Sequence, residues 1–312
     1  MIIGPAKFGL KNRKTPVCRQ RFERKILKFQ QMTIIGVGLI GGSLARAVKE
    51  KRLVAQIVGA GRSQKNLAKA LALGVVDRIE TDHREAVQGS DIVVVCTPVQ
   101  AAVDVVRDIF PAMKPTAILT DVGSVKGPFV RAIEEMNLDT IRFVGGHPIA
   151  GAEKSGVEAS MSTLFQNHRT ILTPTASSSP DAVDALKALW ESVGAHVDII
   201  EPERHDRILA DISHLPHLVA YVLVNLALDG GGVPYAAGGF RDFTRIASSN
   251  PEMWRDISLD NKEALLNSLT AFEKSLSDLR RAVEVQDGEA LELTYRKAKE
   301  GRDDWLRERG WL

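Results

Sequence analysis

The stretch GVGLIG at residues 36–41 decides the fold, because it joins a short apolar run, residues 32–35, to a segment with helical spacing. The first glycine permits a tight turn, the second lets the backbone approach a pyrophosphate, and the third lets helix and strand pack closely. The helix N-terminus offers unpaired N–H groups to phosphates. The stretch predicts a dinucleotide site, with a purely structural turn and an FAD site as alternatives. The predicted cofactor residues are Gly36, Gly38, Leu39, Ile40 and Gly41.

Short apolar runs alternate with amphipathic segments from Lys25 to about Ile200. The first five runs are rich in Val and Ile and almost continuously hydrophobic, which is typical of strands buried on both faces of a parallel sheet. The alternation predicts an α/β fold, with a Rossmann-type, doubly wound, mostly parallel sheet. The expected strands are Met32–Val37, Gln56–Ala60, Asp91–Cys96, Ala117–Val122, Arg142–Val144, Thr170–Thr173 and His196–Ile200.

The pattern changes near Glu201, after which no further strand is expected. Long helices are predicted at Glu203–Leu228, Pro251–Val283 and Gly288–Trp305, with Asn250 as a capping candidate. The glycine-rich segment 229–239 predicts a turn. The chain is thus expected to have a basic, disordered extension at 1–24, a dinucleotide-binding domain at 25–201 and an all-helical domain at 202–312.

Composition narrows the function classes. The 312 residues are 44% hydrophobic and 26% charged, as in ordinary soluble globular proteins, and a net charge of +2 gives no reason to expect nucleic acid as a partner. The basic extension lacks the apolar run of a secretory signal, and no stretch is expected to span a membrane. Two cysteines, Cys18 and Cys96, indicate neither a disulfide framework nor a metal site, so a cytoplasmic location is expected.

The end of the second expected strand bears on the choice of cofactor. NAD sites commonly place an acid there to bind the ribose 2′-hydroxyl. This chain has Gly61, Arg62 and Ser63 instead. Arg62 and Ser63, together with Lys65, could bind a 2′-phosphate, which favours NADP over NAD. The alternative is that Arg62 is a solvated loop residue and both cofactors are used.

Other polar groups follow the expected strands, at the edge where ligands bind in open α/β sheets. Thr97 and Pro98 follow the third strand and are expected beside the nicotinamide. Ser124 follows the fourth. His147 comes after a buried strand and two glycines, and its near-neutral pKa suits a general base.

The helical part adds two pairs of candidates. His214 and His217 are three residues apart and share a helix face, which Pro216 between them should kink. No carboxylate or cysteine accompanies them at ligand spacing, so packing or substrate contact is expected rather than metal. Arg241 and Arg245 are four residues apart, and one of them could bind a carboxylate through a bidentate fork; a surface salt bridge is the alternative.

Five collinear motifs together resemble the prephenate/arogenate dehydrogenase family: GVGLIGGSLA at 36–45, DVGSVK at 121–126, GGHPIAGAEKSG at 145–156, SHLPH at 213–217 and GFRDFTRIASSNPEMW at 239–254. The resemblance implies oxidation and decarboxylation of prephenate, or of its amino analogue arogenate, with NAD(P), on the pathway to tyrosine. It also implies that the helical domain is a dimerisation domain and that the protein is a homodimer.

The resemblance implies roles for single residues. His147 matches the family's catalytic base, which accepts the proton of the ring 4-hydroxyl, and Ser124 matches a serine that hydrogen-bonds this hydroxyl and the histidine. Arg245 matches the arginine that binds the ring carboxylate. His217 contacts the pyruvyl side chain. The remaining substrate-binding candidates are His214, Glu153 at the mouth of the site, and Trp254.

Two departures and two rival functions remain. The family often has an acid where this chain has Gly61 and Arg62, and Ala152 stands where a hydroxyl residue can occur. A β-hydroxyacid dehydrogenase would need a catalytic lysine early in the second domain, but residues 201–228 contain none. A dinucleotide-binding regulator without catalysis is the other rival, and retention of Ser124, His147 and Arg245 argues against it.

Overall fold

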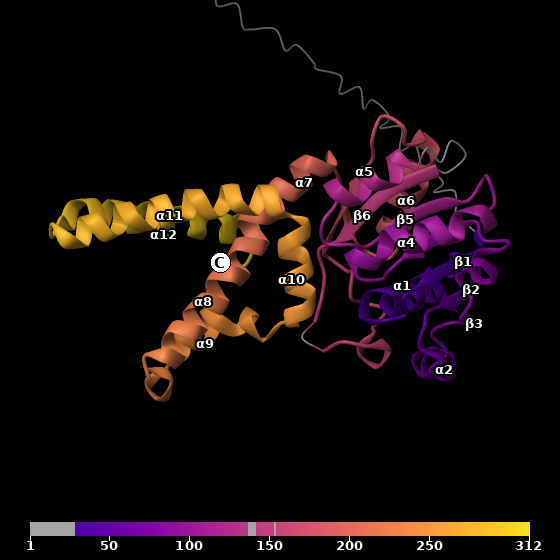
Figure 1. Cartoon of the computed structure of the whole chain (residues 1–312), viewed down its shortest axis with the longest axis horizontal. Helices are drawn as coiled ribbons and strands as arrows, with labels where there is room; N and C mark the ends of the chain where they lie inside the picture. Colours follow the sequence, from indigo (N-terminus) through magenta and orange to yellow (C-terminus); the bar gives the residue numbers. More distant parts are fainter. Residues whose placement is uncertain (1–28, 137–141, 153) are drawn as a thin grey trace, which may run out of the picture.

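The computed structural model describes residues 29–136, 142–152 and 154–312, which form an α/β part and a helical part (Figure 1). The basic extension predicted at 1–24 and the candidate Glu153 lie outside the described residues. The sheet ends with a strand at Ile199, and the first helix of the helical part begins at Pro202.

In the described part of the chain, eight strands form one sheet in the order β3-β2-β1-β4-β5-β6-β7-β8. Neighbouring strands pair in parallel except for β6 and β7. The predicted doubly wound, mostly parallel sheet is therefore confirmed, with its switch point between β1 and β4. The strands are β1 Phe29–Ile35, β2 Val54–Ala60, β3 Arg78–Glu80, β4 Ile92–Val95, β5 Ile118–Asp121, β6 Arg142–Pro148, β7 Arg169–Thr173 and β8 His196–Ile199.

Helices cover both faces of this sheet. Side chains alternate along β4, so that Ile92 and Val94 belong to the core on one face while Val93 and Val95 belong to the core on the other. Both faces are apolar, and this explains why the strands read as continuous hydrophobic runs. One face carries α1 Leu39–Glu50, α2 Gln64–Ala72 and α6 Pro180–Ser192, and the other α3 His83–Val87, α4 Val99–Ile109 and α5 Gly127–Glu135.

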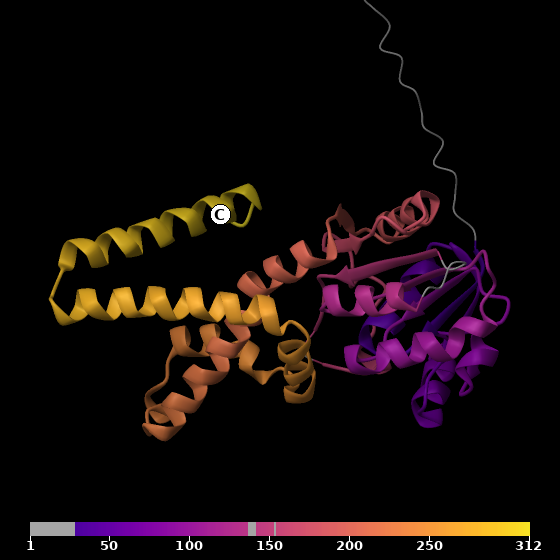
Figure 2. The same cartoon turned by 45° about the horizontal axis from the view of Figure 1, so that its top comes forward.

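The second part is helical throughout, as predicted. Helices α11 and α12 form a hairpin that extends away from the α/β part, and α8 and α9 form a second, shorter arm (Figures 1 and 2). The side chain of Asn250 accepts a hydrogen bond from the Met253 amide and so caps α10, as expected. The helices are α7 Pro202–Leu209, α8 Leu215–Asp229, α9 Gly238–Thr244, α10 Pro251–Asp260, α11 Lys262–Glu284 and α12 Gly288–Glu308.

Two strand predictions need correction. The three-residue edge strand β3 was not predicted, because so short a segment shows no periodicity. Strand β6 was expected to end at Val144 but continues through His147 to Pro148, paired with β7. The two glycines lie inside the strand, where a Cβ on Gly146 would come within 2.8 Å of the Asp121 carbonyl oxygen. They therefore permit close approach of neighbouring strands.

Two helix predictions also need correction. The helix expected at 203–228 contains a π-helical turn, Ala210–His214, directly before the Leu215–Pro216 pair. Proline has no amide hydrogen and cannot donate the regular helical hydrogen bond. The π-helical turn before Pro216 changes the hydrogen-bond pattern there, so that the helix can continue through the proline. The helix expected at 251–283 is divided at Asn261, whose side chain hydrogen-bonds to the Asp206 carbonyl and to His214. Tertiary hydrogen bonds thus override local helix propensity there.

One helix contradicts the expectation that no stretch approaches membrane-spanning length. Among the described residues, the continuous helix Pro202–Asp229 is long and apolar enough by length and composition alone, because residues 212–228 contain no Asp, Glu, Lys or Arg. Only 22% of its most apolar window is buried within the single chain. Its apolar surface is therefore largely uncovered in one copy of the protein.

Candidate active site

A cleft of about 870 Å³ opens at the carboxyl ends of β1, β2 and β4. It brings together six of the residues predicted to bind a dinucleotide: Gly36, Gly38, Arg62, Ser63, Thr97 and Pro98. The other three, Leu39, Ile40 and Gly41, begin α1 and do not line the cleft. Its position beside the switch point of the sheet is where an open α/β sheet binds its ligand.

The three glycines of the fingerprint differ in their surroundings. Gly36 has a φ of +97°, and a Cβ there would lie 2.6 Å from the Cys96 carbonyl oxygen. A Cβ on Gly41 would lie 2.5 Å from the Gly36 carbonyl oxygen, whereas nothing lies within 4 Å of one on Gly38. Gly36 thus serves the turn and Gly41 the close packing, while Gly38 leaves open space for a pyrophosphate beside the N-terminus of α1.

The predicted 2′-phosphate residues lie at the end of β2. The Arg62 side chain is exposed, and no hydrogen bond or ion pair to it is found within the described ranges. The Ser63 hydroxyl accepts a hydrogen bond from the Asn66 amide and so caps α2. Lys65 does not line the cleft. Arg62 is therefore the cation best placed for a phosphate, while Ser63 also has a structural role.

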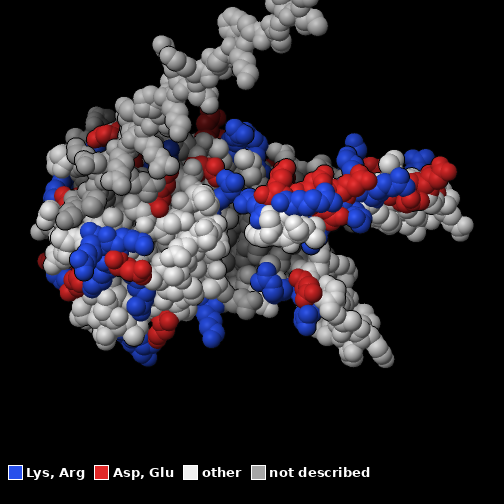
Figure 3. Space-filling model, turned by 180° about the vertical axis from the view of Figure 1, so that it is seen from behind, with Lys and Arg blue, Asp and Glu red and all other residues white. Residues whose placement is uncertain are grey.

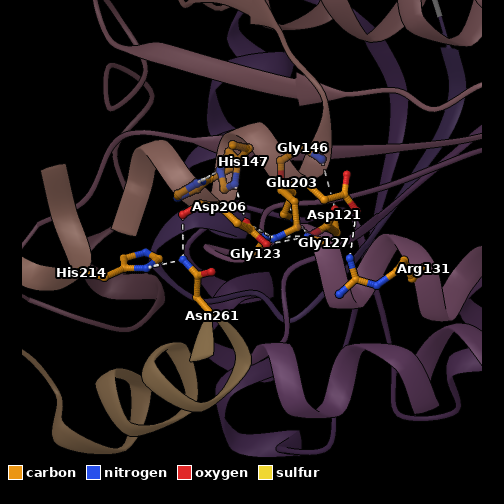
Figure 4. Close-up of polar contacts among 12 residues, drawn as sticks. Asp121, Gly123, Gly127, Arg131, Gly146, His147, Glu203, Asp206, His214 and Asn261 are labelled. Atoms are coloured by element: carbon orange, nitrogen blue, oxygen red, sulfur yellow. Dashed lines mark hydrogen bonds and ion pairs between the residues drawn. The ribbon is translucent and has the colours of Figure 1, made fainter. Parts of the chain in front are cut away.

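A chain of hydrogen bonds begins at His147 on β6 (Figure 4). Its Nδ1 atom lies 2.8 Å from Nε2 of His205, and Nδ1 of His205 lies 2.8 Å from Oδ1 of Asp206. His147 is half-buried, whereas His205 and Asp206, both on α7, are buried. The sequence alone did not identify His205 and Asp206 as site residues. The available signal was their spacing of four and three residues from Leu209, which places them on the apolar face of an otherwise charged helix.

Asp206 is held by the start of α5. Its Oδ1 atom accepts a hydrogen bond from the Lys126 amide at 2.8 Å, and its Oδ2 atom accepts one from the Gly127 amide at 2.7 Å. The N-terminus of a helix stabilises a negative charge in this position. Arg131 and Glu203 form an ion pair at 2.9 Å, which also joins α5 to α7. These contacts fix α7, and with it His205, against the α/β part.

A buried ion pair shapes the loop that carries Ser124. The Lys126 ammonium is fully buried, pairs with the Asp121 carboxylate and donates to the Gly146 carbonyl at 2.9 Å. Asp121 also accepts hydrogen bonds from the amides of Gly123 and Gly146. Both charged residues belong to the DVGSVK motif, but the sequence alone assigned them no role. They join the Ser124 loop to the strand that carries His147.

Ser124 itself is half-buried between β5 and α5. No hydrogen bond between Ser124 and His147 occurs among the residues that the structure describes. The serine therefore lies on the loop next to the histidine strand, and their expected joint contact with a substrate hydroxyl stays a prediction.

Burial and neighbouring positive charge favour the neutral form of His147. Burial lowers the pKa of His147 well below its ordinary value, and the charges of His205, Lys126 and His214 lower this pKa further. Burial also lowers the pKa of His205, although Asp206 opposes this effect. An imidazole that is neutral near pH 7 can accept a proton, so this arrangement suits a general base.

The helical part contributes a cluster around Trp254 on α10. The His217 ring stacks on the indole with the centroids 3.6 Å apart, and the His214 ring contacts it edge-on with the centroids 5.9 Å apart. Burial lowers the pKa of His217, and the charge of Arg245 lowers it further, so Arg245 lies near this cluster. Four substrate-binding candidates are thus brought together: His214, His217, Arg245 and Trp254.

Within residues 29–136, 142–152 and 154–312, no group of three or more His, Cys, Asp or Glu side chains could hold a metal ion. The other candidate arginine, Arg241, is exposed and pairs with Asp242 at 3.0 Å, which is the surface salt bridge considered as an alternative. The Cys96 thiol is free and lines the dinucleotide cleft.

Comparison with known proteins identifies two family domains in this chain. Residues 44–199 match the family model "Prephenate dehydrogenase, nucleotide-binding domain", and residues 201–297 match "Prephenate dehydrogenase, dimerization domain". Together these matches cover most of both structural parts.

Individual relatives agree over almost the whole described chain. The cyclohexadienyl dehydrogenase of Zymomonas mobilis is 37% identical over 282 residues, which are 88% of this chain and 95% of that protein. The prephenate dehydrogenase of Bacillus subtilis is 38% identical over 89% of this chain and 76% of its own length. The crystal structure of Aquifex aeolicus prephenate dehydrogenase with hydroxyphenyl propionate and NAD⁺ superposes with a TM-score of 0.84, at 37% identity, covering 88% of this chain and 98% of that one.

Proposed function

This chain belongs to the prephenate dehydrogenase family, and from that premise we propose that it converts prephenate to 4-hydroxyphenylpyruvate and CO₂, with hydride transfer to NADP⁺ or NAD⁺. It is a nicotinamide-dependent oxidoreductase of tyrosine biosynthesis. The observation that carries the proposal is the place of His147 on β6, where it is hydrogen-bonded to His205 and where burial lowers its pKa well below the ordinary value.

His147 supplies the proton chemistry in this proposal. When bound, the nicotinamide accepts the hydride that leaves C4 of the ring. His147 accepts the proton of the hydroxyl on C4, the carbon that loses the hydride. General-base assistance of this kind contributes about 10²–10⁴-fold to the rate. Ser124 orients the hydroxyl. The C4 oxygen becomes a carbonyl conjugated to the ring. This carbonyl takes up the electron pair of the breaking C–C bond as CO₂ is lost and the ring becomes aromatic, and the His147 imidazolium returns its proton to the resulting phenolate oxygen.

The arginine and histidines of the helical part bind the substrate dianion. Arg245 binds the ring carboxylate, and His217 contacts the pyruvyl side chain beside His214 and Trp254. Glu153 stays a substrate-binding candidate from the sequence alone. The ring carboxylate must leave as neutral CO₂, so a very tight clamp would stabilise the ground state more than the transition state. Arg245 is exposed at the start of a short 3₁₀ segment. This position supports a role in substrate binding rather than in the chemical step.

For the cofactor we propose NADP⁺, with NAD⁺ as the alternative. Support comes from the exposed Arg62 in the cleft wall and from the missing acid at the end of β2. A guanidinium can bind a phosphate through two parallel hydrogen bonds. The main argument for NAD⁺ is that Ser63 already serves as the cap of α2.

We propose a homodimer formed through the helical part. The helix of residues 202–229 exposes large apolar side chains, such as Ile212 at 70%, Leu226 at 62% and Leu228 at 59%. The arm formed by α8 and α9 is largely free of charge toward its tip, whereas charges of both signs are mixed along α11 and α12 (Figure 3). Contiguous apolar surface of this kind is covered by protein or lipid. A second copy is the favoured cover, because residues 201–297 match a dimerization domain. Sedimentation equilibrium should therefore give twice the chain mass.

The cytoplasm is the proposed location. The free Cys96 thiol supports a reducing compartment.

Initial rates of cofactor reduction test the function. Purified protein is assayed with prephenate and with arogenate, each against NAD⁺ and NADP⁺. We expect turnover with prephenate, and faster turnover with NADP⁺. Turnover with arogenate alone would change the proposed substrate from prephenate to arogenate but would leave the proposed oxidative decarboxylation in place. Folded protein that binds the cofactor yet turns over none of the four combinations would contradict the function and favour a dinucleotide-binding regulator.

A further inference from the structure

We propose that His205 and Asp206 fix the tautomer of His147, so that its Nε2 atom carries the lone pair that accepts the substrate proton. The proposal deepens the function proposed above, since it rests on His147 as the base. It assigns His205 and Asp206 as positioning residues, because they act through His147 rather than on the substrate.

The carboxylate of Asp206 sets the direction of the hydrogen bonds in this chain. The Asp206 side chain accepts hydrogen bonds from two backbone amides, those of Lys126 and Gly127. A carboxylate in such a site has only lone pairs to offer. The contact of its Oδ1 atom with Nδ1 of His205, at 2.8 Å, can therefore form only if that nitrogen carries the proton.

The constraint passes through the first imidazole to the second. A neutral imidazole carries one N–H and one lone pair. With its proton on Nδ1, His205 presents a lone pair at Nε2, and this atom lies 2.8 Å from Nδ1 of His147. Nδ1 of His147 must then be the donor. Its single proton is thus held on Nδ1, and Nε2 is left as the basic nitrogen.

The carboxylate is a rigid anchor. Both of its oxygens are held by the first amides of α5, and its backbone carbonyl accepts a hydrogen bond from Nδ2 of Asn261 at 2.9 Å. The Asp206 side chain is 7% exposed and that of His205 is fully buried. A buried imidazole whose donor found no acceptor would cost about 1–3 kcal/mol, so the opposite tautomer of His205 is disfavoured.

The hydrogen bond between the two imidazoles is kept during the reaction. The proton moves from the C4 oxygen to Nε2 of His147, while Nδ1–H remains bonded to His205. The charges of His205, Lys126 and His214 oppose the resulting imidazolium, whereas the raising effect of Asp206 acts on the pKa of His205. No second proton transfer along the chain is needed.

Two variants of His205 separate positioning from packing. His205→Phe keeps a planar ring but removes both hydrogen bonds. His205→Gln places an amide oxygen near the former Nε2 position, where it can still accept from His147. With both proteins folded and binding cofactor, we expect kcat to fall about 10²–10⁴-fold in His205→Phe at nearly unchanged KM, and to fall less than about tenfold in His205→Gln. Equal losses in the two variants would overturn the proposal.

Nitrogen NMR reads the tautomer without any assay of activity. In protein with ¹⁵N-labelled histidine, the resonance of His147 is assigned with a His147→Gln variant. We expect the proton on Nδ1 in the wild type and in His205→Gln, and a population with the proton on Nε2 in His205→Phe. A wild-type His147 protonated on Nε2 would overturn the inference even in an active enzyme. A protein that turns over no substrate but shows the Nδ1–H tautomer would contradict the function and leave the tautomer established.

Discussion

The Nδ1 atom of His147 lies 2.8 Å from Nε2 of His205, and through this contact the proposed base of the α/β part is joined to the first helix of the helical part. Asp206, next to His205, is bonded in turn to the start of α5. The base therefore adopts its described geometry only when the two parts are packed together. Changes in the interface of the two parts should alter catalysis as well as stability.

Replacing the base should act on the rate. We predict that His147→Asn lowers kcat by about 10²–10⁴-fold, because the proton acceptor is lost, and leaves KM nearly unchanged. Steady-state kinetics with prephenate measure both. Retention of the wild-type kcat in a folded variant would show that another group accepts the proton.

Replacing the arginine should act on binding instead. We predict that Arg245→Ala raises KM for prephenate by about 10–100-fold, the loss expected for a hydrogen bond to a charged group, with a much smaller change in kcat. Arg241→Ala is the matched control, because Arg241 lies four residues earlier, is exposed and pairs with Asp242. If the two variants had equal KM values, Arg245 would not be the carboxylate-binding group.

Arg62 should determine the response to the 2′-phosphate. We predict that Arg62→Ala raises KM for NADP⁺ by about 10–100-fold while KM for NAD⁺ stays within about twofold, because only NADP⁺ carries the charge that Arg62 would bind. Lys65→Ala, three residues along and outside the lining of the cleft, should change neither. If Arg62→Ala raised KM equally for both cofactors, Arg62 would contact a part that NADP⁺ and NAD⁺ share rather than the 2′-phosphate.

The buried carboxylate should matter for folding. Asp206→Asn keeps the shape but turns an N–H₂ group toward one of the donors at Lys126, Gly127 or His205. We predict a loss of about 3 kcal/mol in the free energy of unfolding, measured by urea denaturation, since buried charged hydrogen bonds are lost and a donor is left unpaired. Asp242→Asn, at an exposed ion pair, should stay within about 1 kcal/mol of the wild type. Equal stability of the two variants would contradict the anchoring role of Asp206.

Much of the fold could be predicted from periodicity and glycine. Short apolar runs identified seven of the strands, of which the first five are almost continuously hydrophobic because both faces of the sheet are covered, and GVGLIG identified the dinucleotide-binding turn. Strand β3 was missed because three residues carry no period. The end of β6 was misplaced because Gly145 and Gly146 interrupt the apolar run, although they lie inside the strand and serve close packing.

The site was less predictable, for a physical reason. Residues at strand ends, such as His147 and Thr97, can be found from sequence because the carboxyl edge of a parallel sheet is where ligands bind. His205 and Asp206 lie inside helix α7 rather than at the end of a strand, and they belong to no motif that the sequence reveals. Their role depends on the packing of α7 against α5, which is a tertiary contact between residues 79 or 80 positions apart.

The buried and half-buried histidines should make the protein sensitive to mild acid. Burial lowers the pKa of His214 to about 4 and lowers the pKa values of His147, His205 and His217 below their ordinary value of 6.5. Between the folded and the unfolded pKa the unfolded chain binds more protons, so stability increases with pH in this window. The contribution is complete above pH 6.5 and is lost as the pH falls toward 4, by up to about 3 kcal/mol for His214 alone.

Urea denaturation at several pH values measures this loss. We predict that the free energy of unfolding already decreases between pH 6.5 and 5, before carboxylates with ordinary pKa values near 4 are protonated to a large extent. In the same range kcat/KM should fall less than it would with a solvated histidine as the base, because burial lowers the pKa of His147 well below its ordinary value. A fall of kcat/KM centred at pH 6.5, together with constant stability, would show that these histidines are solvated and that the base is not held in the buried chain described above.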